Sequence, residues 1–244
     1  MPATPEASDA RERNDAPSAA ADASATIPNS GTAEVRARLR QSWSPRYRGQ
    51  LHAFATFGFG LAVLFALLLR VRAPTLAELS VVPLTLLYAN LVEWLMHKGP
   101  MHHKTRGLGL IHKRHSLEHH RFFTLREMEL ETARDIKMVL FPPLLIVFFF
   151  AFAAPVGLLL ARLFNGNVAA LFVACALGYF LLYESLHLSY HLPASSPIPR
   201  LPILRALRRH HALHHDPARM TSGNFNVTFP LSDFLFRTRL RDDA

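Results

Sequence analysis

The sequence predicts an all-α protein: an integral membrane bundle of four transmembrane helices, paired in two hairpins, with a histidine-rich helical cap on the cytosolic side. Three observations support this fold class. Four long stretches have almost no charge, the basic residues gather on one side of these stretches, and 13 of the 14 His fall in two bursts. The chain has 244 residues, of which 50% are hydrophobic and 18% charged. This composition excludes a collagen, a disulfide scaffold and a wholly disordered chain.

The apolar stretches are long enough to cross a membrane, because a helix needs about 20 mostly apolar residues to span the bilayer core. Three stretches contain no charge, and the fourth contains only Glu78. The stretches are Leu51–Leu69, Ala73–Val92, Met138–Ala161 and Leu163–Tyr183. We predict transmembrane helices near 51–70, 75–97, 137–161 and 167–191. The alternative, four buried helices of a soluble bundle, does not suit uncharged runs of this length without a polar face.

Residues 1–48 differ in composition from the rest. They are mainly Ala, Ser, Pro, Thr and Arg, with almost no large apolar side chain. Such a segment cannot bury enough surface to offset its ordering entropy, so we predict a disordered N-terminal tail followed by a membrane domain over 49–244. Several acidic residues and the lack of an apolar core argue against a transit peptide and a secretory signal.

The basic residues predict the orientation in the membrane. Short links at 70–74 and 162–167 form the hairpins, so the loop at 98–137 and both termini lie on the opposite side. Of the 27 Lys and Arg, seven lie in the tail, nine in this loop and eight from Arg200 onward, with three on the hairpin side. The positive-inside rule places the basic side in the cytoplasm. The net charge of +9 therefore indicates topology, and no recognised fold supports a nucleic-acid partner.

The two His bursts meet at one membrane surface, because the last two helices fold the second burst back beside the first. The spacings are His97-x4-His102, His115-x3-His119-His120, His187-x3-His191 and His211-x2-His214-His215. On a helix, residues three and four apart share a face, so His187 and His191 converge, as do the three His of the last spacing. A helix end at Gly99–Pro100 would allow a turn to bring the first pair together.

These spacings predict a two-metal site. Ten imidazoles are more than one ion can use, and neutral imidazole suits Zn, Cu, Fe and Ni. Adjacent His119 and His120 point about 100° apart on a helix, which suits two neighbouring metals. Glu93 and Glu184 lie within a turn of a His and are candidate acceptors for its second ring N–H. Cys175 is the only Cys, which excludes an intrachain disulfide and a cysteine zinc cluster.

The remaining His and one acid leave alternatives open. His52 and His103 are expected to be solvated side chains, whereas the roles of His112 and His210 stay undecided. The run from His115 to His119 fits the His-x-x-Glu-His motif of inverted zinc proteases, in which the Glu, here Glu118, activates water. The protease hypothesis leaves the His residues of the second burst unexplained, so we prefer to interpret Glu118 as a solvated acid.

From Glu93 to Thr238 the chain resembles the fatty acid hydroxylase/sterol desaturase superfamily of membrane di-iron enzymes. The segments that carry the resemblance are Glu93-Trp-Leu-Met-His97 through His102, His115-x3-His119-His120, Phe141-Pro142-Pro143, Tyr183-Glu184-x2-His187-x3-His191, His211-x2-His214-His215, and Gly223 through Thr238. This sequence departs from the family pattern at Ser232, where Trp is usual, and at Arg237, where Gly is usual. The second box has three residues before its His pair, where 2-hydroxylases usually have two.

The resemblance implies a set of metal ligands and supporting residues. The implied ligands are His97, His102, His115, His119, His120, His187, His191, His211, His214 and His215. The implied supporting residues are Glu93, Tyr183 and Glu184, and no catalytic residue is expected beyond the metal centre. The cofactors would be two iron ions, with zinc in purified protein as an alternative, and O2 as co-substrate.

The implied function is hydroxylation of a lipid C–H bond at the cytosolic membrane face. A separate donor protein, a cytochrome or a ferredoxin with its reductase, would supply electrons, since no such domain is fused to the chain. Alternatives are a desaturase or a carotenoid or sterol hydroxylase with the same centre, a zinc membrane protease, or a metal-binding protein that is no enzyme. Phe122, Phe123, Leu125 and Met128 either line a lipid entrance or pack at the interface. An excess of Arg over Lys, 23 to 4, favours a bacterial inner membrane.

Overall fold

The computed structural model describes residues 31–241, and this part of the chain is all helical, with no strand and one isolated bridge between Thr124 and Glu127. The helices are α1 (Thr32–Gln41), α2 (Gly49–Leu68), α3 (Leu76–Leu79), α4 (Val81–Met96), η1 (His97–Met101), α5 (Gly109–His112), η2 (Lys113–His119), α6 (His120–Phe122), η3 (Ala133–Asp135), α7 (Ile136–Val139), α8 (Leu145–Leu163), α9 (Gly166–Tyr190), η4 (Ile198–Arg200), α10 (Pro202–His214) and α11 (Leu231–Leu235). The all-α prediction is confirmed for these residues.

Four helices are long and apolar enough to cross a membrane, as predicted: Gly49–Leu68, Leu76–Met101, Leu145–Leu163 and Gly166–Tyr190. Their outward faces carry large apolar side chains, for example Phe54 and Phe152, which are 76% and 77% exposed. Apolar surface of this extent is stable only against lipid or another apolar partner. The chain is therefore a membrane protein.

The third membrane helix begins later than predicted, at Leu145 instead of near residue 137. Residues 136–139 form the separate short helix α7, and Leu140 is extended with φ −74° and ψ 143°. Pro142 and Pro143 explain the break, because proline lacks an N–H and pushes the residue before it out of the helical region. The uncharged run therefore contains two helices, α7 and α8, in place of the single predicted helix.

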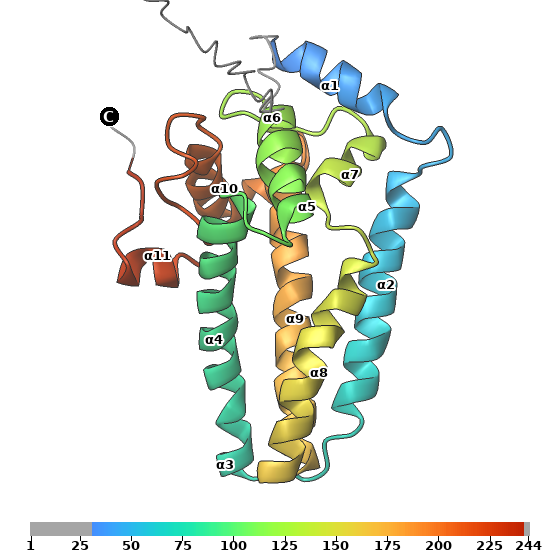
Figure 1. Ribbon diagram of the computed structural model, residues 1–244, viewed down its shortest axis with the longest axis vertical. Helices are drawn as coiled ribbons and strands as arrows, with labels where there is room; N and C mark the ends of the chain where they lie inside the picture. The colour runs from blue at the N-terminus through green and yellow to red at the C-terminus, as the bar shows by residue number, and fades with distance from the viewer. Residues whose placement is uncertain (1–30, 242–244) are drawn as a thin grey trace, which may run out of the picture. The chain divides into compact units, whose positions relative to one another are not determined.

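Helix α9 lies at the centre of the bundle and packs against α2, α4 and α8 (Figure 1). Half of its membrane-spanning window is buried, against 17% for each of the other three helices. Gly60 allows α2 to approach closely, since a Cβ at this position would lie 2.6 Å from Leu181 of α9. Packing against α2, α4 and α8 buries half of the membrane-spanning window of α9, and α9 carries His187 to the cap.

The two hairpin links lie together at the end of the bundle opposite the cap (Figure 1). The Arg72 backbone N–H donates to Asn167 Oδ1 at 2.9 Å, and Asn167 Nδ2 donates to the Arg72 carbonyl at 2.9 Å. Asn165 also caps α9 by accepting from the Val168 N–H at 3.1 Å. These bonds join the two predicted hairpins into one four-helix unit.

The prediction of a disordered tail is wrong for residues 31–48, while residues 1–30 lie outside the described residues. Helix α1 packs on the cap through Val35 and Trp43, each 6% exposed, and Trp43 stacks on Phe122 at 5.9 Å between ring centroids. Arg40 forms two 2.8 Å bonds with Asp135. Burial alone would raise the pKa of the Asp135 carboxyl, but the Arg40 guanidinium and the backbone N–H groups of Thr132 and Glu131 together outweigh burial, and the pKa is lowered. Two buried apolar side chains and the Arg40–Asp135 ion pair therefore attach α1 to the cap.

Candidate metal centre

The structure brings all ten predicted ligands together in two groups, and all ten side chains are buried. We call them the first His group (His97, His102, His115, His120 and His214) and the second His group (His119, His187, His191, His211 and His215). Within each group, one nitrogen of every ring lies within 4.8 Å of the corresponding nitrogen of every other ring. The two groups adjoin, because the His120 and His215 ring centroids are 4.3 Å apart.

Two π-helices explain the five-residue spacings in the first His group. In a π-helix the backbone bonds run from i to i+5, so residues five apart lie on one face. Helix η1 begins at His97 and places its ring 5.1 Å from that of His102. Helix η2 likewise brings His115 and His120 to 4.6 Å. The predicted helix end at Gly99–Pro100 is wrong: the chain continues as a wider turn, in which the missing N–H of Pro100 is tolerated.

Adjacent His residues serve different groups, as the sequence predicted for His119 and His120. The same geometry separates His214 from His215, because consecutive residues on a helix diverge by about 100°. The predicted convergence of the last three His is therefore wrong for His214, which joins the first group while His211 and His215 stay in the second. Helix α10 thus contributes ring nitrogens to both groups.

Most rings are oriented by a hydrogen bond from Nδ1 to an oxygen. Five rings donate from Nδ1 to a backbone carbonyl: His97 to Phe225, His214 to Gly223, His119 to Met138, His191 to Met128, and His215 to Phe123. His102 donates to Ser116 Oγ at 3.2 Å, and this hydroxyl donates in turn to the Met101 carbonyl at 2.7 Å. A carbonyl oxygen can only accept, so these rings carry their proton on Nδ1 and present a bare lone pair on Nε2.

The Nε2 atoms face one another inside each group. In the first group, His102 and His214 have their Nε2 atoms 3.0 Å apart, and in the second group His119 and His215 are 3.1 Å apart. Both members of each pair have Nδ1 protonated, so neither Nε2 can donate to the other. Two lone pairs at this distance repel unless a cation lies between them. Nitrogens that each bind one ion at about 2.1 Å are separated by about 3 Å at a right angle, so the residues fit a metal ion in each group.

The surroundings keep the rings neutral, which is the form that binds metal. Burial, followed by the neighbouring imidazoles, lowers the pKa of His102 from 6.5 to about 2. Burial also lowers the pKa of His191 to about 3. Burial is also the main reason why the pKa values of His119 and His215 fall well below 6.5. At neutral pH these groups therefore offer nitrogen lone pairs without losing a proton first.

The metal-free protein should lose stability as the pH falls below about 6.5. The unfolded chain then binds protons at its His residues, whereas the folded chain does not until the pH approaches the lowered values, about 3 for His191. Protonation therefore favours unfolding throughout this window. Thermal unfolding of metal-stripped protein at pH 8, 6.5 and 5 measures the effect. Equal melting temperatures at the three pH values would contradict it.

Of the predicted supporting residues, Glu93 bonds groups other than a His ring. Glu93 accepts bonds from Thr228 N at 3.0 Å and from Tyr179 Oη at 2.6 Å, and within residues 31–241 it forms no hydrogen bond with a His ring. Glu184 Oε2 accepts from Phe141 N at 3.1 Å. Buried atoms without a partner in the structure include Tyr183 Oη, Glu184 Oε1 and His187 Nδ1. The roles of Tyr183 and Glu184 stay predictions.

The other His residues lie outside both groups. His52 is buried, and not solvated as expected: Nδ1 bonds Tyr47 Oη at 2.8 Å and Nε2 bonds the Phe141 carbonyl at 2.9 Å. His103 is exposed, as predicted. His112 contacts the Met101 carbonyl at 3.3 Å, and His210 contacts Asp233 at 3.3 Å.

The protease motif finds no support in the geometry. Glu118 pairs with Arg114 at 3.2 Å and is 18% exposed, so it is less solvated than predicted. His115 and His119, which would both bind one zinc in that motif, belong to different His groups. Phe122 and Phe123 are fully buried in the cap, which shows packing at these two positions.

A four-helix membrane bundle with ten buried imidazoles in two groups defines a histidine-rich membrane metalloprotein. The family model described as fatty acid hydroxylase matches residues 82–238, which is more than half of the chain. The chain therefore belongs to the fatty acid hydroxylase family, a family of oxidoreductases. No curated protein and no solved structure matches it.

Proposed function

We propose that this protein is an O2-dependent oxygenase that hydroxylates a C–H bond of a membrane lipid, with one iron ion in each His group. The observation that carries this proposal is the pair of adjoining nitrogen-rich groups at the end of a lipid-facing bundle. Imidazole suits both iron and zinc, but zinc has no redox chemistry and would not support hydroxylation. When bound, iron would supply the redox chemistry that uses O2 and two external electrons.

The chain itself supplies orientation and exclusion of water. Carbonyls fix the rings of His119, His191 and His215 through their Nδ1 atoms, so that every Nε2 points inward. Phe123 covers the second group, with its ring 4.1 Å from that of His191. A dry, preorganised site strengthens electrostatic interactions and limits side reactions of the oxidant.

An apolar groove supports a lipid substrate. Its volume is about 360 Å³, and it is lined by Phe57, Ser185, Leu186, Leu188, Ser189, Leu192, Ile198 and Leu204. Helix α9 supplies four of the eight lining residues, and these come from the turn of α9 that also carries His187 of the second group. We propose that an acyl chain enters here from the bilayer.

Leu204→Trp, which narrows the groove, should lower the amount of hydroxylated product formed from long acyl chains, while the metal content of the protein stays unchanged.

The proposal is tested by comparing the lipids of cells with and without the gene, grown with oxygen, and by metal analysis of the purified protein. We expect a hydroxylated lipid only in cells with the gene and about two metal ions per chain. A new double bond or an oxidised ring would instead identify the desaturase or the carotenoid or sterol hydroxylase with the same centre. Metal without any lipid product would favour the metal-binding protein that is no enzyme.

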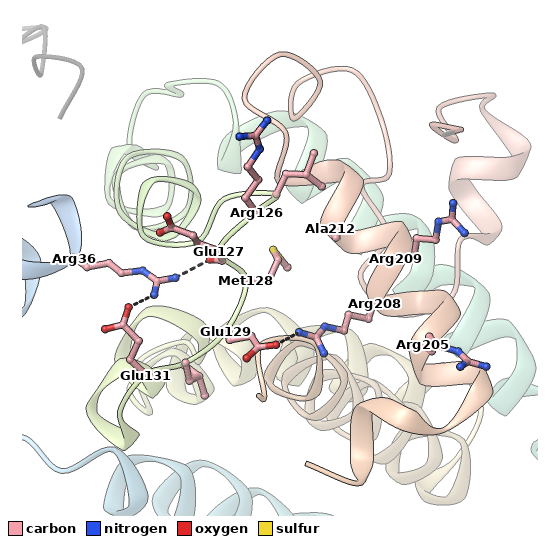
Figure 2. Close-up of a pocket in the computed structure, with 12 residues that line it drawn as sticks. Arg36, Arg126, Glu127, Met128, Glu129, Glu131, Arg205, Arg208, Arg209 and Ala212 are labelled. Atoms are coloured by element: carbon pink, nitrogen blue, oxygen red, sulfur yellow. Dashed lines mark hydrogen bonds and ion pairs between the residues drawn. The ribbon is translucent and has the colours of Figure 1, made fainter. Parts of the chain in front are cut away.

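A basic groove on the cap supports a separate acidic electron donor, such as a cytochrome or a ferredoxin with its reductase (Figure 2). The groove has a volume of about 620 Å³. Its charged lining consists of five arginines, Arg36, Arg126, Arg205, Arg208 and Arg209, and three glutamates, Glu127, Glu129 and Glu131, so positive charge is in excess. It lies close to the second His group, because the Met128 carbonyl in its lining accepts from His191 at 2.7 Å. An acidic protein would associate here by electrostatic attraction.

Reversing the charge of Arg126 and Arg205 to Glu should lower product formation in cells by about tenfold, because the donor then associates more slowly. Both side chains are exposed, so the fold should be unaffected. With dithionite as the reductant, the purified variant should match the unsubstituted protein. If both electron sources gave the same loss, the groove would not be the donor site.

The orientation and compartment are also part of the proposal. The excess of basic residues on the cap side supports a cytoplasmic cap, and the Arg-rich composition supports a bacterial inner membrane. Reporter fusions in the 98–137 loop and in the 162–167 link test the orientation. We expect cytoplasmic reporter activity only from the loop.

A further inference from the structure

The two His groups take their orienting carbonyls from different segments of the chain. In the first group, His97 and His214 donate to Phe225 and Gly223, which lie in the segment after α10. In the second group, all three carbonyl acceptors lie between residues 122 and 138, and we call this range the acceptor segment. Its acceptor carbonyls are those of Phe123, Met128 and Met138. A change in one segment should therefore disturb one metal position first.

The Arg36 side chain of α1 bonds to the acceptor segment (Figure 2). The side chain is only 4% exposed, although α1 lies in the part of the chain with few apolar residues. Its Nε donates to the Phe122 carbonyl at 2.8 Å, and Nη2 donates to the Glu127 carbonyl at 2.7 Å. Its Nη1 forms an ion pair with Glu131. The guanidinium also lies over the rings of Phe122 and Phe123, 5.1 and 5.6 Å from their centroids.

The two carbonyls that Arg36 holds belong to the residues directly before two of the acceptors. Phe122 precedes Phe123, whose carbonyl receives the His215 N–H at 2.7 Å. Glu127 precedes Met128, whose carbonyl receives the His191 N–H at 2.7 Å. A guanidinium is planar and rigid, so one side chain fixes both peptides relative to each other. A bond from Leu130 N to the His191 carbonyl at 2.8 Å ties the same segment to the end of α9.

We propose that Arg36 is a positioning residue for the metal ion of the second His group, acting through the carbonyls of Phe123 and Met128. This inference rests on the two-metal centre proposed above. The carbonyl acceptors of the first group are held by Asp233 and not by Arg36, because Asp233 accepts from Phe225 N at 3.0 Å and from Asn226 N at 2.8 Å in the segment after α10. The N-terminal helix and the C-terminal segment thus each support a different metal position.

The test measures metal content in purified full-length protein after exposure to a chelator, using iron and, separately, zinc as the probe metal. We expect the unsubstituted protein to retain about two ions per chain and Arg36→Ala to retain about one, with affinity at the second position lowered about tenfold. Arg38→Ala is the matched control, because Arg38 lies on the exposed side of the same helix. It should retain both ions.

Ligand variants identify which ion is lost. Adding His211→Ala to Arg36→Ala should remove no further metal, since both changes act on the second group. Adding His97→Ala should remove the remaining ion. Asp233→Asn should lose the ion of the first group. Adding His97→Ala to Asp233→Asn should then remove no further metal, whereas adding His211→Ala should remove the remaining ion. If Arg36→Ala lost both ions together, or the wrong one, Arg36 would have only a general structural role and the inference would be wrong.

A conservative variant covers the case in which Arg36→Ala does not fold. Arg36→Lys keeps the positive charge but donates from one nitrogen, so it cannot hold both carbonyls in the same geometry. It should release the second ion several-fold faster than the unsubstituted protein, and equal release rates would overturn the inference. If the unsubstituted protein bound no metal at all, the proposed function would fail instead, so the two failures are distinguishable.

Discussion

Replacing one ligand in either His group with alanine should lower lipid hydroxylation by on the order of 10³-fold or more, and combining the two changes should cost little more. His102→Ala tests the first group and His211→Ala the second. The loss should be non-additive because residues that act as one catalytic unit fail together. Product formation per folded protein, measured by lipid analysis of cells with matched expression, is the readout. His103→Ala is the control, because His103 is exposed and directly follows a ligand.

The pattern of loss separates a cooperative two-metal centre from one catalytic metal with a structural companion. If only variants of one group lost activity, the other group would serve stability alone. Each single variant should also lose about one metal ion per chain while remaining in the membrane fraction. A fully active His102→Ala or His211→Ala protein would rule out the di-iron proposal for its group.

The membrane bundle could be predicted from the sequence because lipid leaves the chain few choices. Backbone groups cannot stay unpaired in the bilayer core, so an uncharged run of 20 residues must form a helix. The prediction failed at the start of α8, where Pro142 and Pro143 divide one apolar run into two elements. Hydropathy measures the solvent preference of side chains and does not detect a change in backbone direction.

The His groups were predictable where the helix is regular. His187 and His191, four apart on α9, converge as the α-helical rule requires. The pairs five apart need π-helices, which allow His97 and His102 to share a face. The choice of a π turn over an α turn depends on tertiary contacts, such as the bond from the His97 ring to the Phe225 carbonyl, 128 residues away. Local sequence does not contain that information.

The average composition of residues 1–48 does not predict helix α1. A weaker signal was present: Val35, Leu39 and Trp43 recur every four residues and form an apolar stripe. The decisive contact, from Arg36 to the Phe122 carbonyl, joins residues 86 apart. A charged side chain that bonds carbonyls at this separation looks like an ordinary surface residue in the sequence.

Glu93 shows how the right residue can be predicted with the wrong partner. The sequence places it one turn before His97, which suggested a direct bond. Instead its carboxylate accepts from the backbone N–H groups of Val227 and Thr228 and from the Tyr179 hydroxyl. These bonds attach the C-terminal segment to α4. The effect of Glu93 on His97 is therefore indirect, through the Phe225 carbonyl that this segment carries.

Glu93→Ala should accordingly release the C-terminal segment and empty the first His group before the second. The change leaves several donors unpaired, and each buried donor without a partner costs about 1–3 kcal/mol. The expected results are faster proteolysis after residue 222, a metal content near one ion per chain, and loss of hydroxylation. Glu78→Ala is the matched control, because Glu78 bonds Asn165 in the hairpin links at the other end of the bundle and should leave both ions bound. If Glu93→Ala kept both ions and an intact C-terminal segment, the support of the first metal position would have to come from the His97 and His214 rings and their helices alone.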